Sequence, residues 1–463
     1  MDSLAENFKE LQLDNNKEES QQYLILPYKN KQWEKNKSFL MKIKSGRVKD
    51  VKDLIEILKQ MNNLQIDNLV HILKGEDKWI TDFIPNVLLF IADLALSVES
   101  LFKENEVLIL QTAKKQSNNL SRLQVACLLS NMFFLTFENQ ITLNALPETF
   151  DFLKWITFIV DKKRNVSNQQ KLVCLLHYFW RIQKEFASQE NTLQSQVITF
   201  ERLINENDHI LLKISVDENK MNDFEIVDDR GIELFEDFEC IHCDFANKFL
   251  GGGVLRTGCV QEEIMLTVTP EALAGILFCQ RQNDKDAILI TGAQRFCQFE
   301  GYRESFKFVG PHYSNFEVDK LDRKKVYTLA MNAISFKQNP KDQYKKDKIH
   351  RELGKCFIGF QGSSFSESSR TVPIITGNWG CGVFKGDPQL KLIIQWLSAS
   401  LLSRKVYYAS FKENSLLGCQ PVLDLIKNQQ INTIYKGLMD FSKSITQDNN
   451  KESVFEYFLK LLK

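Results

Sequence analysis

The sequence GGGVLRTGCVQEE, from Gly251 to Glu263, places three glycines shortly before a carboxamide and two adjacent carboxylates. Glycine lets the backbone adopt positive φ and lets a ligand approach the main chain closely. Backbone amides can hold phosphate groups, and paired carboxylic acids can cleave a glycosidic bond. Each half of the stretch is common alone, as a glycine turn or a solvated acidic turn. Their combination indicates a site that binds a phosphorylated sugar and acts on it.

The residues just before the glycines add another carboxylate and another amide. An apolar segment ends at Asp244, and Asn247 follows three residues later. Both side chains can hydrogen-bond the vicinal hydroxyls of a ribose, although Asp and Asn at a strand end are more often turn formers. Their position beside the glycines and the Gln261-Glu262-Glu263 triplet favours the binding role.

A second glycine-rich loop runs from Gly377 to Asp387. It lacks the Gly-Lys-Ser/Thr ending of a Walker A loop and the glycine spacing of the dinucleotide fingerprint. It leads into a helix that we expect to open at Asp387-Pro388, and the N-terminal amides of a helix favour an anion. We therefore expect a pyrophosphate between this loop and Gly251–Gly253. The alternative is a tight turn that packs the Trp379 ring.

Strands and helices alternate from about residue 195. Helices are expected from Thr269-Pro270 to about Cys279 and from Asp387-Pro388 onward. This alternation is typical of an α/β domain with a mixed sheet and helices on both faces, in which ligands bind at loops beyond the strand ends. Apolar or β-branched runs bounded by polar turns predict strands at 197–200, 209–214, 238–245, 287–291, 326–331, 356–360, 374–375 and 405–408.

The first part of the chain has a different pattern. Residues 1–22 are polar and charged, and we expect them to be frayed. Apolar residues at helical spacing predict helices at 51–61, 84–101, 123–135 and 172–186. We therefore expect an all-helical accessory domain over 23–194 and the α/β catalytic domain over 195–463.

Composition restricts the possible functions. The 463 residues carry 59 Lys+Arg and 59 Asp+Glu, so there is no overall basic field to bind nucleic acid non-specifically. The most apolar stretch, 87–96, contains Asp93 and is too short to cross a bilayer. Ten scattered cysteines indicate reduced thiols, in the nucleus, the cytoplasm or both. Cys240 and Cys243 lack the second ligand pair of a zinc site, and we expect no metal and no cofactor.

Two motifs carry a family resemblance. The three glycines with the downstream Gln-Glu-Glu resemble the signature of the poly(ADP-ribose) glycohydrolases, and Asn378-Trp379-Gly380-Cys381-Gly382-x-Phe384 resembles that family's second signature. The resemblance covers about 195–420, with helical stretches at 123–137 and 172–182. It implies a macrodomain-like three-layer α/β/α fold preceded by a helical accessory domain. It also implies hydrolysis of ribose–ribose O-glycosidic bonds, mainly from the free end, with release of ADP-ribose and retention of the last, protein-linked unit.

The resemblance also implies roles for individual residues. Glu263 would protonate the departing ribose 2′-oxygen and then activate water, Glu262 would hold the ribose hydroxyls, and Asp244 would support the site. Neighbouring carboxylates oppose each other's ionisation, which helps keep one protonated, but the backbone must turn for both to face one ligand. Substrate contacts are implied for Ile232, Glu233, Asn247, Gly251, Gly252, Gly253, Gln261, Tyr302, Asn378, Trp379, Gly380, Cys381, Gly382, Val383, Phe384 and Phe411.

Two other functions are compatible with the glycine loops. One is an ADP-ribose reader without turnover, which does not need paired glutamates. The other is a hydrolase that removes single ADP-ribose units from protein side chains. The leading interpretation makes protein-attached poly(ADP-ribose) the partner, with a monomeric chain that binds neither a membrane nor nucleic acid sequence-specifically. The stereochemical course and the balance between endo and exo cleavage stay open.

Overall fold

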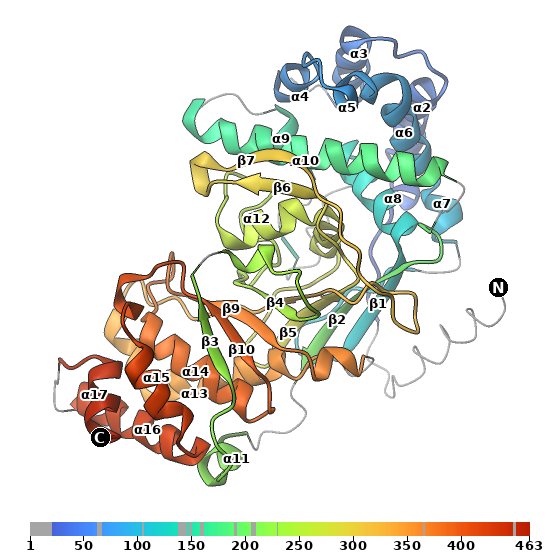
Figure 1. Cartoon of the computed structure of the whole chain (residues 1–463). Coiled ribbons are helices and arrows are strands. Elements are labelled where there is room, and N and C mark those ends of the chain that lie inside the picture. The colour runs from blue at the N-terminus through green and yellow to red at the C-terminus, as the bar shows by residue number, and fades with distance from the viewer. Residues whose placement is uncertain are drawn as a thin grey trace.

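A mixed sheet forms the centre of the α/β part of the chain (Figure 1). The computed structural model describes residues 21–62, 67–103, 106–137, 146–147, 151–157, 162–188, 192–204, 210–228, 230–363, 366–447 and 451–463. Most of the expected frayed segment, 1–22, therefore lies outside the described residues. The sheet has the strand order β1-β2-β5-β8-β4-β9-β10-β3. Its strands are β1 (Gln116–Ser121), β2 (Val197–Ile204), β3 (Phe224–Val227), β4 (Ile241–Asp244), β5 (Asp286–Thr291), β8 (Tyr327–Ala330), β9 (Ile374–Gly377) and β10 (Val406–Ala409).

Strand direction explains where a ligand site lies. β4 pairs in parallel with β8 and β9, and β10 pairs in parallel with β9 and β3, whereas β1, β2 and β5 form an antiparallel side. The carboxyl ends of parallel strands meet at one edge of a sheet. The loops that start at Asp228, Phe245, Asn378 and Ser410 therefore gather at the same edge. A separate hairpin pairs β6 (Cys297–Glu300) with β7 (Lys307–Pro311).

Helices cover both faces of this sheet, as expected for a three-layer α/β/α fold. Successive strand residues point to opposite faces. In β5, Ala287 and Leu289 pack with one face's core and Ile288 and Ile290 with the other's. The sheet lies between α12 and the layer of α13 and α14 (Figure 1). The helices of this part are α11 (Ile210–Val216), α12 (Gln261–Val268), α13 (Lys346–Phe360), α14 (Pro388–Ser400), α15 (Gln420–Lys427), α16 (Ile431–Gln447) and α17 (Val454–Leu461).

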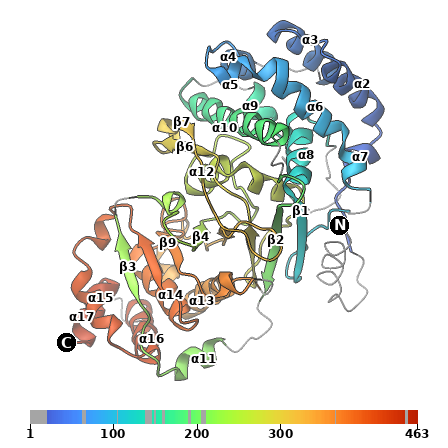
Figure 2. The same cartoon turned by 45° about the vertical axis from the view of Figure 1, so that its right-hand side comes forward.

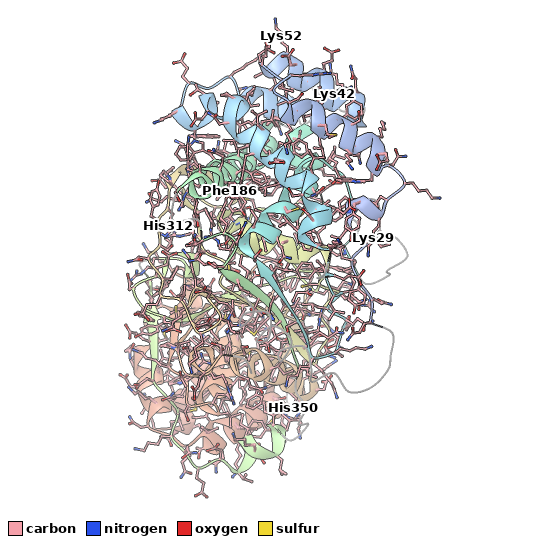
Figure 3. All side chains as sticks on the ribbon, turned by 90° about the vertical axis from the view of Figure 1, so that its right-hand side faces the viewer. Lys29, Lys42, Lys52, Phe186, His312 and His350 are labelled. Carbon is pink, nitrogen blue, oxygen red and sulfur yellow. The ribbon has the colours of Figure 1, made fainter. Side chains whose placement is uncertain are left out.

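The N-terminal part is mainly helical and lies at the opposite end from α15–α17, as the turned view shows (Figure 2). Lys42 and Lys52 lie at this end and His350 at the other (Figure 3). Its elements are α2 (Trp33–Lys44), α3 (Val51–Asn62), α4 (Asp67–Ile72), α5 (Lys78–Thr81), the π-helical η2 (Phe83–Val87), α6 (Leu88–Leu96), α7 (Val98–Leu101), α8 (Arg122–Phe133), α9 (Leu153–Thr157) and α10 (Lys162–Ala187). Among the described residues, no helix combines the length and the apolar character needed to cross a bilayer.

The expectation of an all-helical region over 23–194 is wrong at β1, which pairs antiparallel with β2. The sequence of β1, QSNNLS, is polar, and Asn and Ser are weak strand formers. Its backbone is held by the ladder to β2, and Asn118 hydrogen-bonds Leu108 through its side chain. Tertiary pairing therefore outweighs local propensity, and the sheet begins before residue 195.

Two expected strands are helical. Residues 210–216 form α11, and residues 356–360 are the last turns of α13. A short apolar run is compatible with either structure. In α13 the buried Ile349, Leu353, Cys356 and Phe360 recur at helical spacing over a longer window. The remaining short elements are the 3-10 turns η1 (Pro27–Lys29), η3 (Ile232–Leu234), η4 (Pro270–Leu277), η5 (Arg303–Ser305), η6 (Pro340–Tyr344), η7 (Ser368–Arg370) and η8 (Asn414–Leu416).

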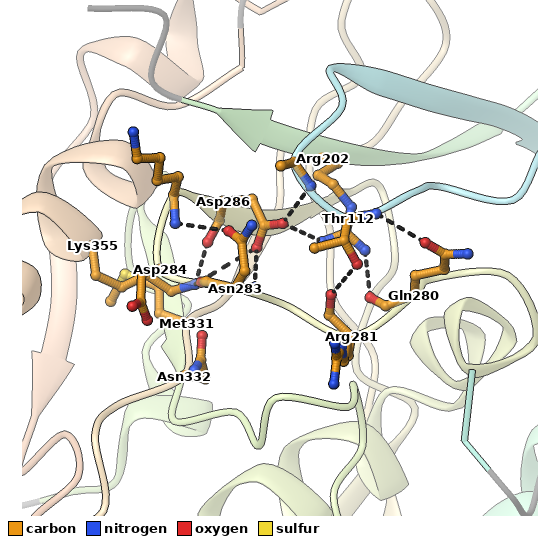
Figure 4. A network of polar contacts seen from close by, with 12 residues as sticks. Thr112, Arg202, Gln280, Arg281, Asn283, Asp284, Asp286, Met331, Asn332 and Lys355 are labelled. Carbon is orange, nitrogen blue, oxygen red and sulfur yellow. Dashed lines mark hydrogen bonds and ion pairs between the residues drawn. The ribbon is translucent and has the colours of Figure 1, made fainter. Parts of the chain in front are cut away.

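A buried polar network joins the sheet to the helical layer behind it (Figure 4). Asp286 on β5 accepts hydrogen bonds from Arg202 Nη1 at 2.8 Å, Ala113 N at 2.9 Å and Asn283 N at 3.0 Å. Lys355 from α13 donates to the carbonyls of Asn283 and Asp286. Because each buried charge has partners, their hydrogen bonds and ion pairs offset the desolvation cost of burying this network.

Candidate active site

A pocket of about 790 Å³ opens at the sheet edge where the parallel strands end. This volume is in the range of sites that bind a drug-sized ligand or a nucleotide. Loops after β3, β4, β9 and β10, the start of α12, and the turn after β6 form its walls. The sequence-predicted residues that line it are Ile232, Glu233, Asn247, Gly252, Gly253, Gln261, Glu262, Glu263, Tyr302, Asn378, Gly380, Cys381, Gly382, Val383, Phe384 and Phe411.

The two glutamates lie in the first turn of α12. On a helix, neighbouring residues are rotated by about 100°, not to opposite sides as in a strand, so Glu262 and Glu263 both line the pocket. The start of α12 is therefore the backbone turn that lets both glutamates face one ligand. The partial positive charge of a helix N-terminus also favours carboxylates at this position.

Backbone amides hold both carboxylates in place. Glu262 accepts from Asn247 N at 2.9 Å and from Gly251 N at 2.7 Å. Glu263 accepts from Gly253 N at 2.9 Å and from Val260 N at 2.8 Å. Each acid therefore has two fixed amide donors. Both side chains are more than nine-tenths buried, so their positions are well defined at the pocket wall.

The first glycine loop encloses these acids and does not leave its amides open for phosphate. Gly251 and Gly253 donate to the glutamates, and the Gly252 amide donates to Phe249 O at 3.0 Å. Gly251 and Gly252 have φ of +86° and +49°, which favour glycine. A side chain at Gly258 would put its Cβ 2.7 Å from Glu263 Oε1. The expectation that Gly251–Gly253 faces a pyrophosphate is therefore corrected: the loop is a cradle for carboxylates.

Asp244, at the end of β4, lies behind the pocket and does not line it. It is fully buried, and its carboxylate oxygens have no hydrogen-bond partner within the described residues. Burial, together with the charges of Glu263 and Glu233, raises the pKa of Asp244 well above its usual value. Burial and the charges of Asp244 and Glu263 likewise raise the pKa of Glu262. Asp244 and Glu262 therefore retain protons at pH values where isolated carboxylic acids would be ionised.

Gln261 and the Ile232-Glu233 pair complete the wall beside the acids. Gln261 Oε1 accepts from Phe245 N at 2.8 Å, and its Nε2 donates to Cys243 O at 3.2 Å. The start of α12 is thus attached to the end of β4. Ile232 and Glu233 lie in η3, and burial raises the pKa of Glu233.

The second glycine loop differs from the first because it presents unused donors. Within the part of the chain that the structure describes, the amides of Gly380, Gly382, Val383 and Phe384 have no acceptor. The loop leads into α14, where the Asp387 carboxylate caps the amides of Gln389 and Leu390 at 2.8 and 3.3 Å. The expected Asp387-Pro388 helix start is therefore confirmed. An anion in the pocket would meet this loop's amides.

Trp379 does not line the pocket. Its ring is fully buried, and Nε1 donates to Met331 O at 2.9 Å. Lys391 Nζ lies 4.0 Å from the ring centroid. Trp379 is therefore a core residue of a tight turn, which was the alternative interpretation of this loop. The prediction that Trp379 contacts the substrate is wrong. Its neighbour Asn378 does line the pocket and is fixed by a 2.7 Å bond from Nδ2 to Ser410 O.

Two aromatic rings lie beside each other at the pocket. The ring centroids of Tyr302 and Phe411 are 5.7 Å apart, with 49° between their planes. Phe411 is 65% exposed and Tyr302 36%, so neither is a core residue. Exposed rings at a pocket can stack on a base.

Several residues of the pocket lining have no recognisable motif in the sequence. Asp228 and Arg230 follow β3, whose pattern FEIV was not recognised as a strand. Glu300, Arg303 and Lys412 flank the two aromatic residues. Asp228 and Arg230 could have been predicted only from the alternating pattern of Phe224–Val227 and the charged turn that follows it. The other three lie on the turns beside Tyr302 and Phe411.

Comparison with known proteins agrees with both parts of the fold. Residues 76–202 match a family model described as poly(ADP-ribose) glycohydrolase, helical domain. Residues 212–417 match one described as poly(ADP-ribose) glycohydrolase, macro domain fold.

Several curated proteins are similar in sequence. Poly(ADP-ribose) glycohydrolase 1 of Arabidopsis thaliana is 27% identical, over 84% of this chain and 83% of the relative. Probable poly(ADP-ribose) glycohydrolase 2 of the same plant is 29% identical, over 70% of this chain and 69% of the relative. Poly(ADP-ribose) glycohydrolase 1 of Caenorhabditis elegans is 38% identical over 42% of this chain. That match spans only 26% of the worm relative's length. The helical part and the macro-fold part thus match the same family in order along the chain, and the chain belongs to the poly(ADP-ribose) glycohydrolase family.

Proposed function

We propose that this chain hydrolyses the ribose–ribose O-glycosidic bonds of poly(ADP-ribose) and releases ADP-ribose. The observation that carries the proposal is the Glu262–Glu263 pair, in which each carboxylate is fixed by two backbone amides at the wall of a nucleotide-sized pocket. Reading ADP-ribose does not require such a pair, whereas cleaving a glycosidic bond does. The relatives named for this activity support the same conclusion.

Glu263 is the proposed general acid and base. As the C1″–O2′ bond breaks, the Glu263 carboxyl gives its proton to the departing 2′-oxygen, and positive charge develops at C1″. The resulting carboxylate then takes a proton from water as the water oxygen bonds to C1″. Atoms and charges balance, and the acid returns to its starting form. General acid–base catalysis of this kind contributes about 10²–10⁴-fold in rate.

Glu262 and Asp244 have supporting roles in this proposal. Glu262 binds the ribose hydroxyls and adds negative charge near the developing cation. Asp244 lies behind the pocket without hydrogen-bond partners in the described chain. Its burial and the charges of neighbouring acids raise its pKa, so the cluster holds a proton more readily than isolated acids do. The cluster shares its protons, and the proposed reaction starts from the form in which Glu263 carries a proton and Glu262 is ionised.

The rest of the ADP-ribose unit has a proposed place in the same pocket. The open amides of Gly380, Gly382, Val383 and Phe384 would bind the pyrophosphate. Tyr302 and Phe411 would stack on a base or cover a ribose. Ile232 and Glu233 would read the adenine, and Asn247 would contact a ribose hydroxyl. We propose that the terminal unit of the polymer enters, so that cleavage is mainly exo.

The decisive assay supplies labelled poly(ADP-ribose) on automodified protein and sizes the products over time. Our proposal predicts ADP-ribose as the main product, with polymer shortening and one unit left on the protein. A second arm supplies protein carrying only mono-ADP-ribose, from which little release is expected. Release from the second substrate at a similar rate would favour the mono-ADP-ribosyl hydrolase. Binding without any release would favour a reader.

We also propose that the chain works as a monomer in a reducing compartment, the nucleus or the cytoplasm. All ten cysteines are free, and nine are buried, which is compatible with reduced thiols. Imaging of a tagged full chain would test the compartment, and light scattering at working concentration would test the monomer. Location in a secretory compartment, or a dimer mass, would contradict these statements.

A further inference from the structure

A lysine from the helical part of the chain lies beneath the loop that cradles the catalytic acids. Lys171 belongs to α10, which packs against α12 (Figure 1). Its Nζ donates to Val254 O at 3.0 Å and to Arg256 O at 3.1 Å. Both carbonyls are in the segment between Gly253 and Gly258. Lys171 therefore contacts the same loop whose amides hold Glu262 and Glu263.

A second group from the helical part reinforces this contact. Trp155, in α9, donates from Nε1 to Val254 O at 2.8 Å. The Val254 carbonyl therefore accepts two hydrogen bonds, which uses both of its lone pairs. The ring of Trp155 lies 5.7 Å from Lys171 Nζ. Two neighbouring helices thus converge on one turn of the glycine loop.

Lys171, like the buried Arg404, is bonded to backbone carbonyls and not to a carboxylate. Its side chain is fully buried, and no carboxylate in the described residues lies within ion-pair distance. Burial lowers the pKa of Lys171 to about 8, while the nearby Cys259 and Glu263 raise it. A buried ammonium without a counter-charge is costly. The hydrogen bonds of Lys171 to the loop therefore offset a desolvation cost that a neutral side chain would not incur.

Lys355 provides a direct comparison. It is also fully buried, it also donates to two carbonyls, and burial lowers its pKa to about 7. Unlike Lys171, it has the Asp286 carboxylate at 3.8 Å. It belongs to the network behind the sheet (Figure 4) and does not line the pocket. Both lysines are buried and donate to two carbonyls. Lys171 donates to the loop around the acids, whereas Lys355 donates to the network behind the sheet.

We propose that Lys171 is a positioning residue: it holds the 251–258 loop so that the amides of Gly251 and Gly253 fix Glu262 and Glu263. The inference rests on the proposed hydrolysis, in which those acids act. It gives the helical part a role in the reaction, because the reactive geometry then depends on a contact that the α/β part cannot make alone. A misplacement of about 1 Å at a reacting group can cost about 10²-fold in rate.

The test combines turnover with a direct measure of loop order in the full chain. The variants are Lys171→Met, which removes charge and donors, Lys171→Arg, which keeps both, and the matched control Lys355→Met. Each is assayed for kcat per folded molecule on labelled polymer, for the Kd of ADP-ribose, and for hydrogen–deuterium exchange of residues 249–260. Thermal unfolding measures the folded fraction of each variant.

We expect Lys171→Met to lower kcat about 10²-fold, to change the ADP-ribose Kd far less, and to speed exchange of the loop. Lys171→Arg should recover part of the rate. Lys355→Met should lose stability but keep the loop's exchange and its turnover per folded molecule. Wild-type loop exchange and wild-type kcat in Lys171→Met would overturn the inference. If the wild type releases no ADP-ribose, the proposed function fails, and loop exchange alone still decides the role of Lys171.

Discussion

At the residue scale, the acids near the pocket differ in how they are satisfied. The carboxylates of Glu262 and Glu263 each accept two amide hydrogen bonds, whereas the buried carboxylate of Asp244 accepts none from the described chain. An unpartnered buried carboxyl is stable mainly in its neutral form. Burial therefore favours the protonated form of Asp244, and ionising this carboxyl in the folded chain costs stability.

Asp244→Asn tests that cost. The folded-state pKa of Asp244 lies above its unfolded value, which is about 4. Between the two values the folded chain binds more protons, so wild-type stability falls as pH rises through this window. Asn does not titrate. We therefore expect the Tm of Asp244→Asn to exceed that of the wild type at pH 8, and the difference to shrink toward pH 4.

The matched control is Asp286→Asn. Asp286 is equally buried but accepts from Arg202, Ala113 and Asn283. Because Asn replaces one acceptor oxygen with a donor, this variant should lower Tm at pH 8. Equal destabilisation of both variants at pH 8 would show that the Asp244 carboxylate has hydrogen-bond partners, as the Asp286 carboxylate does.

At the scale of elements, the two glycine loops have different tasks. The first, 251–258, wraps the carboxylates and is bonded to the helical part, whereas the second, 378–384, lines the pocket and has four amides without an acceptor in the described chain. They looked equivalent in the sequence because both are rich in glycine. Hydrogen-bond partners distinguish them, and these depend on where α12 and α14 begin.

Gly258→Ala tests the first loop. Its Cβ would lie 2.7 Å from Glu263 Oε1 and 2.8 Å from Cδ, so the Glu263 carboxyl must move. We expect kcat to fall about 10²-fold with little change in the Kd of ADP-ribose, measured by calorimetry. The control is Gly354→Ala in α13, where a Cβ meets nothing within 4 Å. That change should stabilise the helix by about 0.5–1 kcal/mol and leave turnover unchanged.

Phe411→Ala tests the aromatic pair. Stacking on a base contributes about 1–3 kcal/mol, so the Kd of ADP-ribose should rise about 5- to 150-fold. Tyr313→Ala removes a ring that is 69% exposed and lies outside the pocket lining. An unchanged Kd in Phe411→Ala, or an equal loss in both variants, would remove Phe411 from the ligand site.

At the scale of the whole molecule, the fold follows from sequence where local signals agree with tertiary contacts. The strands near 197–200, 287–291, 326–331 and 405–408 and the Asp387-Pro388 helix start are where they were predicted. Residues 210–216 and 356–360 were mistaken for strands because a short apolar run fits either structure. β1 was missed because the partner strand, not its own polar residues, stabilises it.

Most residues of the candidate site could be predicted from the sequence, but their hydrogen-bond partners could not. Motif residues near the strand ends line one pocket because parallel strands place their carboxyl ends together. Sequence could not reveal that the first loop's amides are already used, or that Trp379 is core. It also could not reveal Lys171, whose helix is more than 60 residues from the loop in the chain but packs against α12. These facts depend on long-range packing.

The proposed function depends most directly on Glu263, and the sharpest measurement compares Glu263→Gln with the wild type on labelled poly(ADP-ribose). Gln keeps the size and an acceptor of the side chain but cannot exchange the proton. Glu317→Gln, at an 82% exposed side chain, is the control. We predict that Glu263→Gln releases ADP-ribose about 10²–10⁴-fold more slowly per folded molecule, while its Kd for ADP-ribose stays close to wild type. Its Tm should fall, because Gln replaces one of the two oxygens that accept backbone amides with a donor. Polymer breakdown by Glu263→Gln at the wild-type rate would contradict the account.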